Sequence, residues 1–166
     1  MRIFYPNMYV SSLTNINIDK LKKIGIKAIL FDLDNTLVPW NSNDLAKETA
    51  EWFASLQRAG FKTCILSNNS QQRVAGMCDV LAIPGLHKAS KPRRRAFCRA
   101  MQMLNVKPEE TAMVGDQVFT DVLGGNRLGL FTILVVPMSS HEFIGTRINR
   151  QFEKIVLRRI KHQLIQ

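Results

Sequence analysis

Short apolar runs alternate along the chain with longer segments in which apolar residues recur every three or four positions. The runs are typical of buried strands, and the longer segments are typical of amphipathic helices. The predicted strands cover residues 26–32, 61–66, 111–115 and 130–136, and a very short one precedes His87. This alternation predicts an α/β fold: a Rossmann-like three-layer sandwich in which helices cover both faces of a mostly parallel sheet, with right-handed crossovers.

The predicted helices lie between these strands, and the two ends of the chain have patterns of their own. A length of 166 residues suits one domain with a hydrophobic core, so we expect 1–166 to be a single domain. Residues 1–17 mix polar residues with turn formers and predict an irregular arm, whereas residues 147–164 predict a basic C-terminal helix. The other predicted helices are a short one at 19–24 that ends at Gly25, one that Ser42 or Asn43 caps and Gly60 ends, one over 70–82, one that Lys91-Pro92 opens, and a short one that Gly124-Gly125 breaks.

The charge of the chain indicates the kind of partner. Its 23 Lys and Arg residues exceed its 13 Asp and Glu residues, which gives a formal net charge of +10. This excess favours an anionic partner: a phosphorylated substrate, an acidic lipid or a nucleic acid. The alternative is that the charge serves solubility alone.

The cysteines and the apolar runs indicate the compartment. Cys64, Cys78 and Cys98 are widely spaced in apolar-patterned segments, which favours reduced core thiols in a cytoplasmic protein. The first residues lack the apolar core of a secretory signal. The longest apolar run, 128–138, is interrupted and is shorter than a membrane span requires.

Two carboxylates directly follow the first predicted strand. Asp32 and Asp34 are separated by one residue, so strand alternation would point both side chains toward one site if the strand ended here. Two close carboxylates repel unless a cation lies between them, and oxygen ligands suit Mg²⁺. A carboxylate held on Mg²⁺ can also attack phosphorus and form an aspartyl-phosphate. The alternative is a polar turn after a buried strand.

Further polar residues fall at the same expected edge of the sheet. Ser67 follows the second strand, Asp116 and Asp121 follow residues 111–115, and Lys91 precedes a helix. Ligands of parallel α/β sheets bind outside the carboxyl ends of the strands, which favours one shared site. The alternative is that Ser67 caps a helix, Lys91 is solvated, and the two aspartates are turn or cap residues.

At these residues the chain resembles the haloacid dehalogenase superfamily of phosphotransferases, over about residues 26–136. The four motifs stand in order as Asp32-Leu33-Asp34-Asn35-Thr36, Leu66-Ser67-Asn68, Lys91-Pro92, and Gly115-Asp116 through Asp121. The chain is also similar to the YqeG-like branch of subfamily IIIA in Tyr5-Pro6, Tyr9-Val10 and Thr146-Arg147-Ile148-Asn149-Arg150. That branch is related to phosphatases that act on phosphatidylglycerophosphate.

The resemblance implies a role for each motif residue. Asp32 would be the nucleophile, and Asp34 would protonate the leaving oxygen and later deprotonate water. Asp121 would act through water or hold Lys91. The implied phosphate ligands are Thr36, Ser67, Asn68 and Lys91, and the implied Mg²⁺ ligands are Asp32, Asp34 through its backbone carbonyl, and Asp116.

Many relatives carry a lid domain between these motifs, and this chain has no room for one. Residues 37–66 are used for one helix and one strand, and residues 68–90 for one helix and a short connection. An open, capless site admits a large substrate but excludes water poorly. A macromolecule, a lipid headgroup at a membrane surface or a partner subunit could supply the missing wall.

Two basic segments bear on the partner. One surrounds Lys91 and is either an anion-docking surface or a solvated face; it consists of His87, Lys88, Lys91, Arg93, Arg94 and Arg95. The other is the predicted helix at 147–164, which would either pack on the sheet or lie on acidic lipid.

The sequence and its resemblance together predict a capless, Mg²⁺-dependent phosphomonoesterase that acts through an aspartyl-phosphate. The resemblance makes phosphatidylglycerophosphate the leading substrate, which would place the protein at the inner face of the membrane. The alternatives are a phosphatase of a soluble phosphometabolite or a phosphoprotein, and a non-catalytic basic module that binds RNA. Nucleic acid is the weaker partner because only Trp40 is positioned for base stacking. An oligomer is compatible with the sequence.

Overall fold

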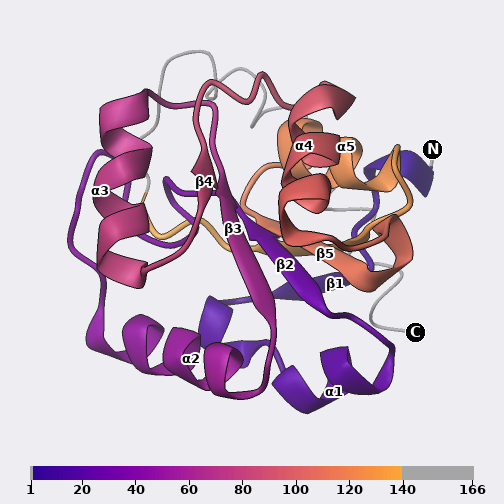
Figure 1. Ribbon diagram of the computed structural model, residues 1–166, viewed down its shortest axis with the longest axis horizontal. Helices are drawn as coiled ribbons and strands as arrows, with labels where there is room; N and C mark the ends of the chain where they lie inside the picture. Colours follow the sequence, from indigo (N-terminus) through magenta and orange to yellow (C-terminus); the bar gives the residue numbers. More distant parts are fainter. Residues whose placement is uncertain (1, 140–166) are drawn as a thin grey trace.

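A computed structural model describes residues 2–139, and the predicted helix at 147–164 lies outside these described residues. Six parallel strands form one sheet in the order β1-β6-β5-β2-β3-β4 (Figure 1). The strands are β1 (Met8–Val10), β2 (Ala28–Phe31), β3 (Lys62–Leu66), β4 (Gly85–Leu86), β5 (Thr111–Gly115) and β6 (Phe131–Val135). The helices are α1 (Ile18–Lys23), α2 (Lys47–Arg58), α3 (Gln71–Leu81), α4 (Arg94–Leu104) and α5 (Leu123–Asn126), the last preceded by a π-helical turn, η4 (Val118–Val122). The predicted α/β fold is thus confirmed, and every described strand is parallel.

Side-chain alternation along β2 divides the core into two layers. Ile29 and Phe31 pack under α1, α2 and α3, whereas Ala28 and Leu30 face the opposite side, under α4. All four are fully buried, as expected for a central parallel strand with helices on both faces. Figure 1 shows α4 beside α5 on one side of the sheet.

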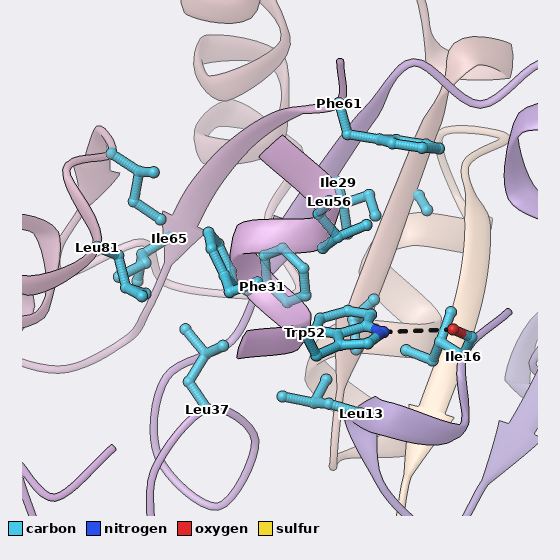
Figure 2. Close-up of a cluster of buried hydrophobic side chains, with 14 of the residues drawn as sticks. Leu13, Ile16, Ile29, Phe31, Leu37, Trp52, Leu56, Phe61, Ile65 and Leu81 are labelled. Atoms are coloured by element: carbon cyan, nitrogen blue, oxygen red, sulfur yellow. Dashed lines mark hydrogen bonds between the residues drawn. The ribbon is translucent and has the colours of Figure 1, made fainter. Parts of the chain in front are cut away.

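The larger layer is built around aromatic rings. Phe31 contacts Phe53 with ring centroids 5.2 Å apart, and Trp52 edge-on at 6.1 Å. The indole Nε1 of Trp52 donates to the backbone carbonyl of Ile16 at 3.4 Å, the dashed line in Figure 2. Trp52 is therefore a core residue whose one polar atom has a partner.

The expectation of a wholly irregular arm is wrong for Met8–Val10, which forms the edge strand β1. This strand pairs in parallel with β6, with Met8 opposite Ile133. Asn7 fixes the register, because its backbone N–H donates to the Thr132 carbonyl and its side chain accepts from the Thr132 N–H, both at 2.8 Å. Only three half-buried residues form the strand, so no apolar run marks it.

Two predicted helix boundaries are also wrong. The helix expected to begin after Ser42 or Asn43 begins at Lys47, because Ser42 accepts from the Asp44 N–H and Asn43 accepts from Arg73. Gly124 and Gly125 lie inside α5 and do not break it.

Close packing explains both glycines of α5. A Cβ on Gly124 would lie 2.6 Å from Phe97 Cε2, and one on Gly125 would lie 2.6 Å from Thr132 Cγ2. The helix therefore approaches α4 and β6 more closely than any side chain at these positions allows, and this contact outweighs the low helix propensity of glycine.

The rest of the described chain bears on access and on redox state. Residues 37–66 contain only α2 and β3 as helix and strand, and residues 68–90 contain only α3 and β4. Within residues 2–139 no helix has both the length and the apolar character needed to cross a bilayer.

The three cysteines are free. Cys64 is buried, and burial raises its pKa to about 12, while Cys78 and Cys98 are partly exposed.

Candidate active site

The carboxyl ends of three neighbouring strands bring three polar side chains together. Asp32 follows β2, Ser67 follows β3, and Asp116 follows β5, the strand on the other side of β2. Backbone pairing continues one residue past two of these strands: the Asp32 N–H donates to the Val114 carbonyl and the Ser67 N–H to the Leu86 carbonyl. All three side chains are buried although each is polar, which requires partners inside the site.

The loop after β4 carries Lys91 to the same edge. The N–H groups of Lys88 and Ala89 donate to the carbonyls of Asn69 and Ser67, so the loop remains attached to the loop after β3. Asn68 then holds the backbone of Lys91: its Oδ1 accepts from the Lys91 N–H at 2.7 Å, and its Nδ2 donates to the Lys91 carbonyl at 3.4 Å. Asn68, predicted as a phosphate ligand, thus has the main chain of Lys91 as its partner in this structure.

Lys91 bridges two carboxylates inside the site. Its Nζ lies 2.6 Å from Asp32 Oδ1 and 2.7 Å from Asp121 Oδ1, and the lysine side chain is only 2% exposed. Burial by itself lowers the pKa of Lys91, but the charges of Asp121 and Asp32 outweigh it and hold the pKa above its ordinary value. The ammonium therefore stays charged at physiological pH and fixes both carboxylates.

Burial and neighbouring charges also change the pKa of Asp32, the candidate nucleophile. The pKa of Asp32 is raised to about 6: burial is the largest cause, Lys91 opposes it, and the charge of Asp121 also raises the pKa. The carboxylate form, which nucleophilic attack requires, thus becomes dominant only above about pH 6 in the absence of a further cation.

Three buried aspartates form the one group of potential metal ligands found among residues 2–139. Asp32, Asp116 and Asp121 can each place an oxygen within 4.8 Å of the other two. Their three negative charges and the one positive charge of Lys91 leave a formal charge of −2, which a divalent cation would neutralise. All donors are carboxylate oxygens, the ligands of hard cations. The residues present therefore fit a divalent metal ion.

Two further contacts shape this group. The hydroxyl of Thr36, a predicted phosphate ligand, lies 3.5 Å from Asp116 Oδ1, within long hydrogen-bond distance. The backbone N–H of Gln117 donates to Asp121 Oδ2 at 3.2 Å. Gly115 leaves room for Asp121, because a Cβ on residue 115 would lie 2.6 Å from Asp121 Cβ and closer still to its carboxylate.

Strand alternation would have required the side chains of Asp32 and Asp34 to point toward one site, but the Asp34 carboxylate is not part of the cluster around Asp32. Strand β2 ends at Phe31, so alternation does not extend to Asp34, and the third acid beside Asp32 and Asp116 is Asp121. The Asp34 carboxylate instead accepts from Arg73 Nη2 at 2.9 Å and, through its other oxygen, from Asn69 Nδ2 at 2.9 Å. Its predicted metal contact, through the backbone carbonyl, stays a prediction.

Sequence reasoning missed two residues of this site. Arg73, in the first turn of α3, pairs with Asp34, and nothing in its spacing from the motifs marks it. Asn35 has a left-handed backbone, φ 61°, and its Oδ1 accepts from the Trp40 N–H and from Ser139, while its carbonyl accepts from the Met138 N–H. Asparagine is one of the few non-glycine residues that adopt this backbone readily, which is the signal that could have identified it.

Comparison with known proteins identifies the family. A model of haloacid dehalogenase-like hydrolases matches residues 40–129, more than half of the chain. The chain belongs to this family. This haloacid dehalogenase-like hydrolase is 42% identical over 162 residues to a protein of Bacillus subtilis described as probable phosphatase YqeG, covering 98% of the chain and 94% of that relative.

More distant relatives are longer proteins. The hydrolase is 30% identical to phosphatidylglycerophosphate phosphatase 1 of Arabidopsis thaliana, with 93% of the chain matched but only 47% of that relative. The corresponding protein of Chlamydomonas reinhardtii is 27% identical, with 90% of the chain and 59% of that protein matched. The hydrolase thus spans about half the length of these two relatives.

Solved structures share the fold. An uncharacterized protein from Listeria monocytogenes superposes with a TM-score of 0.58 at 21% identity, covering 71% of the hydrolase and 85% of that chain. The cobalt-bound deoxy-D-mannose-octulosonate 8-phosphate phosphatase of Haemophilus influenzae superposes with a TM-score of 0.56 at 19% identity, covering 70% of each chain. The family match and the Bacillus relative make this hydrolase a haloacid dehalogenase-type phosphatase, a hydrolase of phosphoric monoesters, and they favour the enzyme over the non-catalytic RNA-binding module.

Proposed function

We propose that this phosphatase is a Mg²⁺-dependent phosphomonoesterase that forms an aspartyl-phosphate on Asp32, with phosphatidylglycerophosphate as its substrate. One observation carries the chemical part: Asp32 is buried against the ammonium of Lys91, in one cluster with Asp116 and Asp121. A carboxylate in this setting is desolvated, and a cation holds one of its oxygens in place. These conditions favour attack on a phosphorus atom once the cluster is charge-balanced.

In the first half-reaction a carboxylate oxygen of Asp32 attacks phosphorus, and the bond between phosphorus and the ester oxygen breaks. Asp34 gives its proton to the leaving oxygen, so the alcohol departs neutral. Lys91, Ser67 and Thr36 would hold the phosphoryl oxygens, and Asn68 contributes by fixing the backbone of Lys91 as well as by its predicted phosphate contact.

In the second half-reaction Asp34 takes a proton from water, and the water oxygen attacks the same phosphorus. The bond from phosphorus to Asp32 breaks, which releases inorganic phosphate and restores the carboxylate. Asp32, Asp116 and the backbone carbonyl of Asp34 would hold Mg²⁺, which supplies positive charge to the phosphoryl oxygens when bound. Asp121 keeps Lys91 in place through its contact of 2.7 Å.

Three observations support the choice of substrate. The relatives from Arabidopsis and Chlamydomonas are named phosphatidylglycerophosphate phosphatases. The segments between the motifs contain no helix or strand beyond the core of the fold, which supports a capless site that admits a large headgroup. Lys88 and Arg93–Arg95 are exposed close to Lys91, where they could attract an anionic surface. The proposal places the enzyme in the cytoplasm, peripheral to the inner face of the membrane.

The test is a substrate panel assayed with Mg²⁺ and with a chelator. It compares phosphatidylglycerophosphate in vesicles with soluble phosphometabolites, a phosphopeptide and p-nitrophenyl phosphate. Asp32→Asn should abolish turnover of every substrate, whereas Asp79→Asn, at an exposed position of α3, should leave it unchanged. Full turnover by Asp32→Asn, or turnover that survives removal of all divalent metal, would contradict the mechanism; a preference for a soluble phosphate would contradict the substrate alone.

A further inference from the structure

Arg73 is a charged group at the site that the proposed mechanism does not use. Its side chain is only 10% exposed and reaches from α3 to the loop after β2. Nε and Nη2 donate to Asp34 Oδ1 at 3.3 and 2.9 Å, and Nη1 donates to Asn43 Oδ1. A guanidinium is thereby fixed beside the residue that protonates the leaving group in the proposed reaction.

Asp34 has other partners that keep it in place. Asn69 Nδ2 donates to Asp34 Oδ2 at 2.9 Å, and the Asn41 N–H donates to Oδ1 at 3.2 Å. An ion pair largely withdrawn from water adds little net stability, because desolvation of the two charges offsets their attraction. Binding of an anionic ligand is therefore a better explanation for the presence of Arg73 than a role in holding Asp34 in place.

The geometry defines where such a ligand would lie. In the proposed reaction the leaving oxygen is one hydrogen bond from Asp34, and Arg73 is one hydrogen bond further on. The guanidinium is then within about 6 Å of the leaving oxygen, two hydrogen-bond lengths. A glycerol bridge between two phosphates spans a similar distance. Within the described residues the contacts of Arg73 use three of its five N–H groups, and a guanidinium binds phosphate oxygens in pairs.

The charges of the site separate this position from that of the scissile phosphate. Lys91, the cation next to Asp32, is engaged by Asp32 and Asp121 on the nucleophile side. A second anionic group on the substrate would require a cation of its own, on the leaving-group side. Arg73 is the cation that contacts Asp34 there.

We infer that Arg73 is a specificity-determining residue that binds a second, anionic phosphate on the leaving-group side of the substrate. The inference rests on the proposed function and narrows its substrate class to phosphomonoesters whose leaving group carries a phosphodiester. A phospholipid and its water-soluble, deacylated headgroup present the same chemistry, so the experiment includes both.

The experiment compares kcat/KM of wild-type enzyme, Arg73→Gln and Arg73→Lys on three substrates. These are glycerol 1-phosphate, glycerophosphoglycerophosphate and phosphatidylglycerophosphate in vesicles. All three have an alkoxide leaving group that needs a proton from Asp34, so an effect of Arg73 on that acid alone would lower all three values equally. Arg73→Gln should lose at least tenfold more on both substrates with a phosphodiester than on glycerol 1-phosphate, and Arg73→Lys should lose less than Arg73→Gln. The control is Arg58→Gln, which removes an exposed arginine at the end of α2. The chain there leads into the amino end of β3, at the edge opposite the site. This variant should change none of the three kcat/KM values.

A second measurement needs no variant and covers the case in which Arg73→Gln does not fold. Glycerophosphoglycerol, which carries only the phosphodiester, should inhibit wild-type hydrolysis of p-nitrophenyl phosphate competitively, and glycerol should not. Equal losses on all three substrates, losses confined to vesicles, or absence of this inhibition would overturn the inference while the phosphatase mechanism stands. Failure of the wild-type enzyme to hydrolyse any of the three would overturn the mechanism itself and the inference with it.

Discussion

Gly115 provides the space that the carboxylate of Asp121 occupies. A Cβ on residue 115 would lie 2.6 Å from Asp121 Cβ, closer than side chains approach in proteins. The aspartate in turn holds Lys91 at 2.7 Å, so the absence of a side chain on a strand residue sets the position of the buried ammonium. The glycine of this motif is thus explained by packing against its own aspartate.

Gly115→Ala should therefore impair catalysis by displacing Asp121 and, through it, Lys91. We expect kcat/KM for p-nitrophenyl phosphate to fall at least tenfold, because a misplaced cation no longer matches the phosphoryl oxygens. Steady-state kinetics measure this loss of activity, and a urea titration measures the stability of the variant. Gly76→Ala is the matched control, since a Cβ there meets nothing within 4 Å and alanine favours the helix by roughly 1 kcal/mol; unchanged activity in Gly115→Ala would contradict the packing argument.

The raised pKa of Asp32 predicts a dependence of stability on pH in the metal-free protein. A carboxyl group with a higher pKa in the folded state than in the unfolded state stabilises the fold while protonated, and this contribution is lost as pH rises through about 6. Asp32→Asn removes the ionisation. The free energy of unfolding of Asp32→Asn minus that of the wild type, measured in the presence of a chelator, should thus rise between about pH 4 and 6 by on the order of 2 kcal/mol.

Denaturant titrations at several pH values measure this difference. Divalent metal should reduce it, because a bound cation favours the ionised carboxylate. Asp79→Asn, at an exposed position, serves as the control for a change of charge alone. A constant difference between Asp32→Asn and wild type across this range would show that the buried ionisation is not coupled to folding.

The exposed arginines near Lys91 should matter for a membrane-borne substrate and much less for a small soluble one. Each basic residue near an acidic membrane contributes on the order of 1 kcal/mol. Replacement of Arg93, Arg94 and Arg95 by Ala should cost about 3 kcal/mol of vesicle affinity if the contributions add, and the loss should shrink as salt screens the charges. Vesicle cosedimentation and turnover at two salt concentrations measure it.

A control with the same change of charge comes from α1. Lys20, Lys22 and Lys23 are exposed, and α1 leads into the amino end of β2, the edge opposite the site. Their replacement by Ala should leave vesicle turnover nearly unchanged. Equal effects of the two triple variants would indicate a response to net charge alone, and no effect of either would make the arginines an ordinary solvated face.

Much of the fold and of the site could be predicted from local sequence. The apolar runs at β2, β3 and β5 are long enough to identify buried strands, and a parallel sheet places the residues after these strands at one edge. That rule alone predicts that Asp32, Ser67 and Asp116 gather. The three residues of β1 are half-buried at the sheet edge and carry no such pattern.

The remaining features depend on contacts between distant segments. Arg73 meets Asp34 because α3 packs beside the loop after β2, 39 residues earlier in the chain. Gly124 and Gly125 stay helical because α5 approaches Phe97 and Thr132, and propensity alone predicts a break. Such contacts follow from the assembled fold and leave no local signature.

Asn35 gives the site a mechanical property. The residue follows Asp34 directly, and it holds Met138 and Ser139, about a hundred positions later in the chain, by hydrogen bonds from both its main chain and its side chain. A force or binding event that shifts Ser139 therefore acts on Asp34 through a single residue. Met138 and Ser139 are in this way connected through one residue, Asn35, to Asp34, the proposed acid–base residue.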